Sequence, residues 1–66
     1  MTGVIKRVLL PRGYGFIYGD DGREYFMQAR ECNVWSGETI REGLRVQFES
    51  KELADGRFRA LRVVVL

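Results

Sequence analysis

The chain has 66 residues, which is enough for one domain with one hydrophobic core and too few for two. With 45% hydrophobic residues, eight glycines and one proline, the composition excludes a disordered or low-complexity chain. The formal net charge is only +2, so the case for an anionic partner depends on where the 11 basic residues lie. Most of them are arginine, which pairs with phosphate in a forked geometry and also stacks on bases.

The residue inventory excludes several kinds of chemistry. Cys32 is the only cysteine and there is no histidine, so neither an intramolecular disulfide nor a zinc site of the usual type can form. We interpret Cys32 as a buried apolar side chain. No phosphate-binding G-x-x-x-x-G-K loop is present, and we predict no enzyme activity, no cofactor and no small-molecule substrate. No long apolar run follows Met1, so we expect no signal peptide and no membrane span, and we expect the cytoplasm as the compartment.

The first half of the chain predicts a three-stranded meander. Val4 to Leu10 is rich in β-branched and aliphatic residues and ends at the turn Pro11-Arg12-Gly13. Tyr14 to Tyr18 is expected to form the second strand. Gly19 to Gly22 predicts a hairpin turn, because Asp-Gly adopts positive φ angles at little cost, and Glu24 to Ala29 resumes as the third strand.

The second half predicts a long connection and two further strands. Arg30 to Gly43 breaks the alternation and is expected to be a long loop that includes a short helical turn. Leu44 to Ser50 alternates apolar and polar residues, which is typical of a strand with one buried face. Ala54 to Gly56 turns the chain into a last strand, Arg57 to Leu66. The sequence therefore predicts one all-β domain over residues 1–66, a five-stranded antiparallel barrel of the oligonucleotide-binding (OB-fold) kind.

Aromatic side chains are expected to share one face of the second and third strands. Tyr14 and Phe16 point the same way because side chains alternate along a strand, and Gly15 between them is expected to leave the opposite face uncrowded. Phe26 and Gln28 can lie beside that pair on the third strand. Single-stranded nucleic acid suits such a surface, because unpaired bases stack on aromatic rings for about 1–3 kcal/mol each.

The competing interpretation is that these aromatic rings pack in the core, as single aromatic residues on strands usually do. Other residues already supply a core from several strands, however, and Tyr25 is expected to turn inward with them. These expected core residues are Ile5, Ile17, Met27, Val46, Phe48 and Val63. We therefore favour exposure of the three rings, with Lys6, Arg7 and Arg12 beside them to contact phosphates.

The sequence resembles a bacterial cold-shock domain over almost its whole length. The similarity runs through Thr2 to Lys6, Gly13 to Ile17, Asp20 to Gly22 and Glu42 to Phe48. Gly13 to Ile17 matches the first ribonucleoprotein motif of that family, and Tyr25 to Gln28 lies where the second motif is found. The resemblance implies a five-stranded barrel that binds single-stranded RNA and DNA with little sequence preference, often as an RNA chaperone or transcription antiterminator.

The same resemblance assigns functional residues. By position, the family's stacking residues carry over onto Tyr14, Phe16 and Phe26, and its binding lysine on the first strand carries over onto Lys6. Gln28 stands at the family's histidine and is expected to hydrogen-bond a base edge.

Several family residues are replaced in this chain. Arg7 and Val8 stand where the family has tryptophan and phenylalanine, Leu9 replaces an asparagine, and Ala29 replaces a phenylalanine. Losing stacking groups at Val8, Gln28 and Ala29 would cost at most roughly 3–9 kcal/mol of binding free energy, because such terms rarely add fully.

Two features are expected to offset part of that loss. The Arg7 guanidinium can stack on a base, and Trp35 in the long loop either brings a new ring over the face or plugs the barrel. Arg57, Arg59 and Arg62 add charge near the last turn and strand. A solvated face is the ordinary explanation for these three arginines, with phosphate contact as the alternative.

A second hypothesis is a protein-interaction or self-associating barrel with weakened nucleic-acid binding. The reason for this hypothesis is that Val8, Leu9 and Ala29 make one side of the barrel more aliphatic. We expect a monomer, with a homodimer as the alternative. Asp20 and Asp21 lie on a hairpin turn, and their expected role is turn chemistry.

Overall fold

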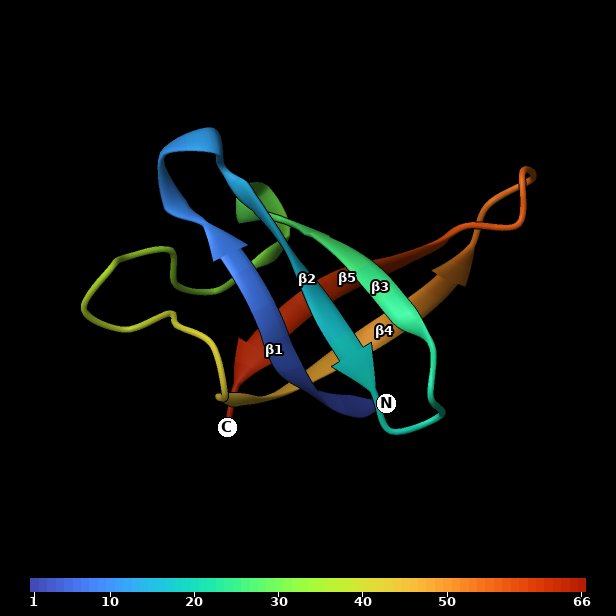
Figure 1. Cartoon of the computed structure of the whole chain (residues 1–66), viewed down its shortest axis with the longest axis horizontal. Helices are drawn as coiled ribbons and strands as arrows, with labels where there is room; N and C mark the ends of the chain where they lie inside the picture. The colour runs from blue at the N-terminus through green and yellow to red at the C-terminus, as the bar shows by residue number, and fades with distance from the viewer.

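Five strands close into one barrel in a computed structural model that describes all of residues 1–66 (Figure 1). The strands are β1 (Thr2–Leu9), β2 (Tyr14–Gly19), β3 (Glu24–Gln28), β4 (Arg45–Glu52) and β5 (Phe58–Val65). Their order around the barrel is β1-β2-β3-β5-β4. The predicted five-stranded all-β barrel is confirmed. Its neighbouring strands are antiparallel except at the seam between β3 and β5, where the pairing is parallel.

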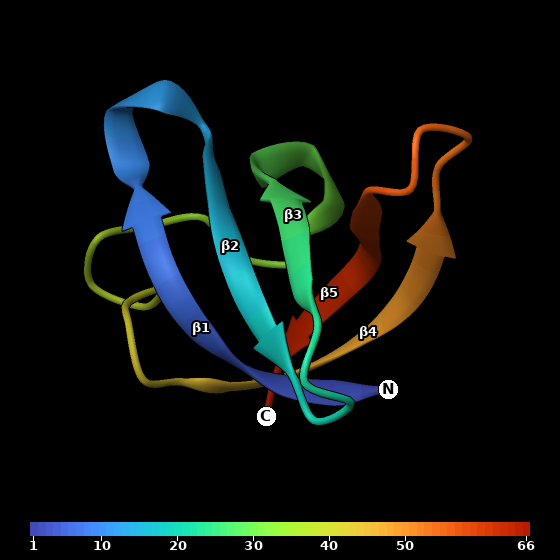
Figure 2. The same ribbon diagram turned by 45° about the vertical axis from the view of Figure 1, so that its right-hand side comes forward.

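Short turns connect the three strands of the meander, as the sequence predicts. A 3-10 helix over Leu10–Arg12 follows β1, with Pro11 in its first turn. Gly13 ends this helix in the left-handed region, with φ of 76°, which glycine adopts without steric cost. The turn between β2 and β3 contains Gly22 in the same conformation, with φ of 84°. These two turns place β1, β2 and β3 side by side (Figure 2).

The core is built from side chains that point into the barrel. All six core residues expected from the sequence are buried, and Tyr25 is buried beside them with 1% of its surface exposed. Ile40 from the long loop and Ala60 from β5 complete the cluster of nine. Tyr25 contacts Phe48 with ring centroids 4.9 Å apart, so the interior holds its own aromatic pair.

Gly15 faces this interior, and the structure corrects the reason expected for it. A Cβ at this position would lie 3.0 Å from Met27 Cε and still closer to the backbone carbonyl oxygen of Arg7. The face opposite Tyr14 and Phe16 is therefore crowded, not open. Glycine is needed because β1 and the core side chains approach β2 too closely for any larger residue.

A bulge in β1 redirects its basic residues. The register of β1 against β2 shifts between Ile5 and Arg7, so Lys6 is the extra residue. Lys6 and Arg7 are consecutive and both exposed, whereas the residues before them alternate between buried and half-buried. Two cations in a row thus face solvent at the middle of the strand.

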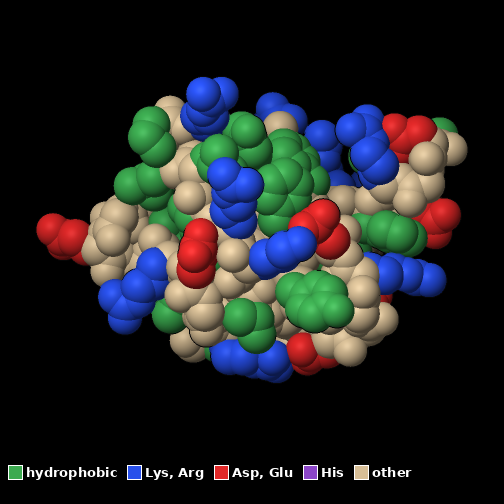
Figure 3. Space-filling view, in the orientation of Figure 1, with side chains coloured by type: hydrophobic (Ala, Val, Ile, Leu, Met, Phe, Trp, Pro, Cys, Tyr) green, Lys and Arg blue, Asp and Glu red, His purple; other side chains and the backbone are tan.

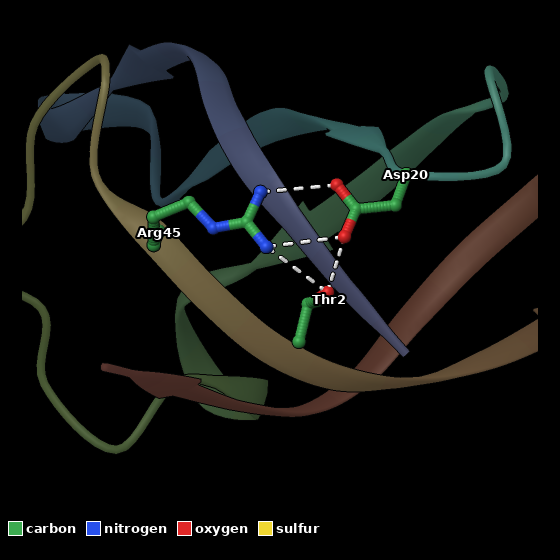
Figure 4. Close-up of polar contacts among 3 residues, drawn as sticks. All are labelled: Thr2, Asp20 and Arg45. Atoms are coloured by element: carbon green, nitrogen blue, oxygen red, sulfur yellow. Dashed lines mark hydrogen bonds and ion pairs between the residues drawn. The ribbon is translucent and has the colours of Figure 1, made fainter.

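The turn carboxylates anchor the meander to the rest of the barrel. Arg45 at the start of β4 donates through Nη1 to Asp20 Oδ1 at 3.0 Å and through Nη2 to Asp20 Oδ2 at 3.1 Å (Figure 4). Thr2 at the start of β1 donates its hydroxyl to the same carboxylate and accepts from Arg45 Nη2 at 3.1 Å. These hydrogen bonds, first that from Arg45, lower the pKa of Asp20. Asp21 accepts from Tyr25 Oη at 2.6 Å, and this bond lowers the pKa of Asp21.

The segment between β3 and β4 contains one short helical turn, as expected. This 3-10 helix spans Ala29–Glu31. Cys32 follows it and packs against the core but is half-buried, not buried as expected from the sequence; its thiol donates to the Gln28 carbonyl oxygen at 3.4 Å. Burial, with a smaller contribution from Glu31, raises the pKa of Cys32 to about 11, so the thiol stays neutral at pH 7.

No helix in the structure has the length and apolar character needed to cross a membrane.

Candidate nucleic-acid interface

Three aromatic rings lie next to one another on the outer side of β2 and β3. Phe16 pairs directly with Phe26 across the two strands, and Tyr14 pairs with Gln28. The ring centroids are 6.0 Å apart for Tyr14 and Phe16, 5.6 Å for Tyr14 and Phe26, and 5.8 Å for Phe16 and Phe26. All three residues are half-buried. We call this set of Tyr14, Phe16 and Phe26 the three-ring surface.

Alternation along the strands keeps the three-ring surface out of the core. Gly15 and Ile17 on β2 point inward, as do Tyr25 and Met27 on β3, and all four are buried. Figure 3 shows hydrophobic side chains gathered over the upper parts of β2 and β3 with Lys and Arg side chains around them. The contiguous aromatic surface expected from the sequence is therefore present, but its three rings are half-buried and not fully exposed as expected.

A cavity of about 480 Å³ opens beside the three-ring surface. The three rings form part of its wall, and the rest comes from Glu24, Arg57 and Phe58. This space is hollow enough for a planar ring to enter, and most of its lining residues are apolar. Its geometry suits a flat apolar group with a charged or polar edge.

The three basic residues expected to border this surface, on β1 and in the turn that follows it, differ in their contacts. Arg7 pairs with Phe16 in the strand register and is exposed, so it borders the rings directly. Lys6 Nζ forms an ion pair with Glu24 Oε1 at 2.8 Å, with both side chains about half exposed. Arg12 is exposed at the end of its 3-10 helix. The sequence alone does not show that Lys6 already has a carboxylate partner.

Two arginines of β5 and its preceding turn also reach the rings. Arg57 lines the cavity, and its Nε donates to Asp55 Oδ2 at 2.7 Å. Arg59 pairs with Phe26 in the β3–β5 register, and its Cζ lies 5.9 Å from the Phe26 ring centroid. Arg62 instead forms an ion pair with Glu49, so the solvated-face explanation fits Arg62.

Gln28 lies on the outer side of β3 but is half-buried. Its Oε1 is buried and has no hydrogen-bond partner. A buried amide oxygen without a partner is unusual, since most such groups are hydrogen-bonded. Base recognition through Gln28 stays a prediction.

Trp35 does not line the cavity beside the three rings. It packs against the core cluster, and its indole Nε1 donates to the Leu10 carbonyl oxygen at 3.2 Å. Of the two roles left open by the sequence, the geometry supports the structural one, in which the ring ties the long loop to the turn after β1.

The aliphatic replacements do not form a wide exposed patch. Val8 is half-buried and packs against the core cluster. It lines a separate hollow of about 410 Å³ with Leu10 and Ile40, bordered by Arg41 and Glu42. Leu9 and Ala29 are half-buried as well. The observation that motivated a protein-interaction surface on this side is therefore weaker in the structure than in the sequence.

Sequence reasoning did not identify Phe58 as part of the site. Phe58 begins β5 and would be assigned to the core side from its spacing to Ala60. It does contact Tyr25, with ring centroids 5.6 Å apart, yet it also lines the outer cavity. The available signal was its position between Arg57 and Arg59, an aromatic residue enclosed by two cations directly after a turn.

Comparison with known proteins agrees with the geometry. Residues 1–66 match the family model of the "Cold-shock" DNA-binding domain. The chain is 34% identical over 63 residues to Cold shock protein 1 of Lactiplantibacillus plantarum. That similarity covers 96% of this chain and 94% of the relative, so the two proteins correspond over nearly their full lengths.

Proposed function

Because this chain belongs to the cold-shock DNA-binding domain family, we propose that it binds single-stranded RNA or DNA with little sequence preference. The observation that carries the proposal is the three-ring surface, half-exposed and bordered by Arg7, Arg57 and Arg59. Aromatic faces next to cations match the chemistry of an unpaired strand, which offers flat bases and a charged backbone.

In the proposed mechanism, the aromatic rings bind the bases of the nucleic acid and the cations bind its phosphates. Bases stack on Tyr14, Phe16 and Phe26, and every base has a π-face, so stacking discriminates little between sequences. Phosphates meet the guanidinium groups and release counterions, which makes binding weaken as salt rises. Duplex bases are already stacked on one another and are not available to the rings.

Binding of this kind leads to a proposed role in the cell. A protein that holds unpaired bases and releases them readily prevents strands from forming stable secondary structure. We therefore propose action as an RNA chaperone or transcription antiterminator, with a monomer as the binding unit. The reduced number of rings predicts modest affinity, which is compatible with rapid exchange between strands.

Titration of the intact chain with a pyrimidine-rich single strand tests the proposal. We expect a mobility shift at low salt, quenching of tyrosine emission through Tyr14, and a much weaker response to a duplex of the same sequence. Trp35 emission is a poor reporter, because its ring packs against the core. The absence of both a shift and a tyrosine response with micromolar strand at low salt would contradict the proposal.

A further inference from the structure

Phe58 stands opposite the three-ring surface across the seam between β3 and β5. It lines the cavity of about 480 Å³ and also a second, adjoining one of about 120 Å³. Phe26 and Arg57 line both cavities too. The two hollows therefore adjoin, and we call them together the groove; Phe26 from β3 and Phe58 from β5 both line it.

The ring of Phe58 is held from within and reachable from outside. It is half-buried, and its contact with the buried Tyr25 at a ring tilt of 58° fixes it to the core. The Cζ atom of Arg23 lies 4.7 Å from its centroid, so a cation already uses the π-face of this ring. A group that is planar and π-rich can take the same kind of position over the ring.

Two arginines, Arg57 and Arg59, also line the groove. Arg57 uses Nε for Asp55, on a side chain that is 79% exposed. Arg59 and Leu53 line the second cavity beside Phe58. The carboxylates of Asp55 and Glu24 already have partners, because Asp55 is bound to Arg57 and Glu24 is bound to Lys6. The groove thus has aromatic walls and a guanidinium rim.

We propose that Phe58 is a fourth stacking residue, which extends the nucleic-acid site beyond β2 and β3 and holds one further unpaired nucleobase in the groove. This inference rests on the proposed function. The base enters between Phe26 and Phe58, and Arg57 and Arg59 contact the phosphates on either side of it. Arg23 gives up its place over the ring and becomes available to the backbone. The site is then longer by one nucleotide than the three-ring surface alone.

The test compares Phe58→Leu with a matched control, Tyr18→Leu. Leucine keeps apolar bulk against Tyr25 but removes the π-face, while Tyr18 is an aromatic residue on β2 that is 57% exposed and lies outside both cavities. Affinity is measured for pyrimidine oligonucleotides that increase by one nucleotide. We expect Phe58→Leu to weaken binding of the longer strands about 5- to 30-fold. We also expect the affinity of this variant to stop rising with strand length one nucleotide earlier than that of the wild-type chain. Tyr18→Leu is expected to match the wild-type chain.

A uniform loss at every length, or an equal loss in Tyr18→Leu, would overturn the assignment of Phe58. If the wild-type chain binds and Phe58→Leu binds identically, the proposed function stands and only this inference fails. If the wild-type chain does not bind, the proposed function itself fails.

A measurement on the unmodified chain covers the case in which Phe58→Leu does not fold. Aromatic proton resonances of Phe58 and Phe26 are followed by NMR during titration with a strand of saturating length. We expect both rings to shift together, with no change at Val64, which lies outside both cavities. Shifts at Phe26 without any at Phe58 would overturn the proposal.

Discussion

The outer and inner faces of β2 and β3 both contain aromatic residues but differ in burial. Tyr14, Phe16 and Phe26 point outward and remain half-buried, whereas Tyr25 and Met27 point inward and are at most 1% exposed. Both faces contain aromatic residues, so residue type alone does not separate them. Position on the two-residue period does, because one face meets the barrel interior and the other meets solvent.

This difference shows how a chain of 66 residues combines a core with a binding surface. The inner face stabilises the fold through burial. The core is complete without the rings of the outer face, so these rings stay partly accessible to solvent. Gly15 allows both, since its missing side chain lets β1 and Met27 pack closely behind Tyr14 and Phe16. Substitutions on the two faces should therefore affect different measurements.

The largest expected effect is on the inner face. Met27→Ala should destabilise the fold by about 2–5 kcal/mol, because it leaves a cavity in a fully buried site. A domain of this size has only about 3–10 kcal/mol of total stability, so much of the protein could unfold. Urea denaturation measures the change. An unchanged unfolding midpoint would show that the inner face does not carry the stability.

The matching change on the outer face should affect binding instead. Phe26→Ala is expected to cost about 1–3 kcal/mol of affinity for single strands and about 1 kcal/mol or less of stability. Parallel strand titration and urea denaturation of the same sample separate the two effects. Tyr18→Ala serves as the control, since Tyr18 lies on the neighbouring strand β2, outside the cavity. A large loss of stability with intact binding would reverse the assignment of the two faces.

A smaller effect is expected from the charges around the outer face. Arg12→Gln should weaken binding about two- to threefold at low salt and reduce the slope of log affinity against log salt by about 0.7. Lys6→Gln should change the slope less, because Glu24 already pairs with Lys6. Titrations at several salt concentrations test both. A loss for Arg12→Gln that persists unchanged at high salt would show that Arg12 does not act through phosphate.

The smallest expected effect concerns the anchor at the turn between β2 and β3. The pKa of Asp20 is lowered in the folded state, so its stabilising contribution is present above the unfolded value of about 3.9 and is lost as pH falls through the lowered folded value. Asp20→Asn should lower Tm slightly at pH 7, and the difference from wild type should disappear in strong acid. Thermal unfolding across pH 2 to 7 measures it, and a difference independent of pH would contradict this role for the ion pair with Arg45.

Much of the fold was predictable from the sequence because it depends on local rules. Alternation and turn residues identified five strands, and the same alternation assigned Ile17 and Met27 to the core and Phe16 and Phe26 to the outside. These are properties of single strands, which the order of residues determines before any strand pairs with another.

The features that could not be predicted depend on how distant strands meet. Phe58 joins the site because the parallel β3–β5 pairing brings the start of β5 beside Phe26, and no local pattern encodes that approach. The pairing of Lys6 with Glu24 depends on the bulge in β1. Trp35 could not be assigned, because its position depends on a carbonyl group 25 residues away.

The parallel seam is also the shortest ladder in the barrel. Two residue pairs join β3 to β5, whereas five join β2 to β3. Backbone amides at this seam should exchange with solvent sooner than those of the meander, because fewer hydrogen bonds must open together. Phe26 lies on β3 and Phe58 on β5, so a ligand that contacts both rings should stabilise the pairing of these two strands. Bound ligand should therefore slow amide exchange in β5.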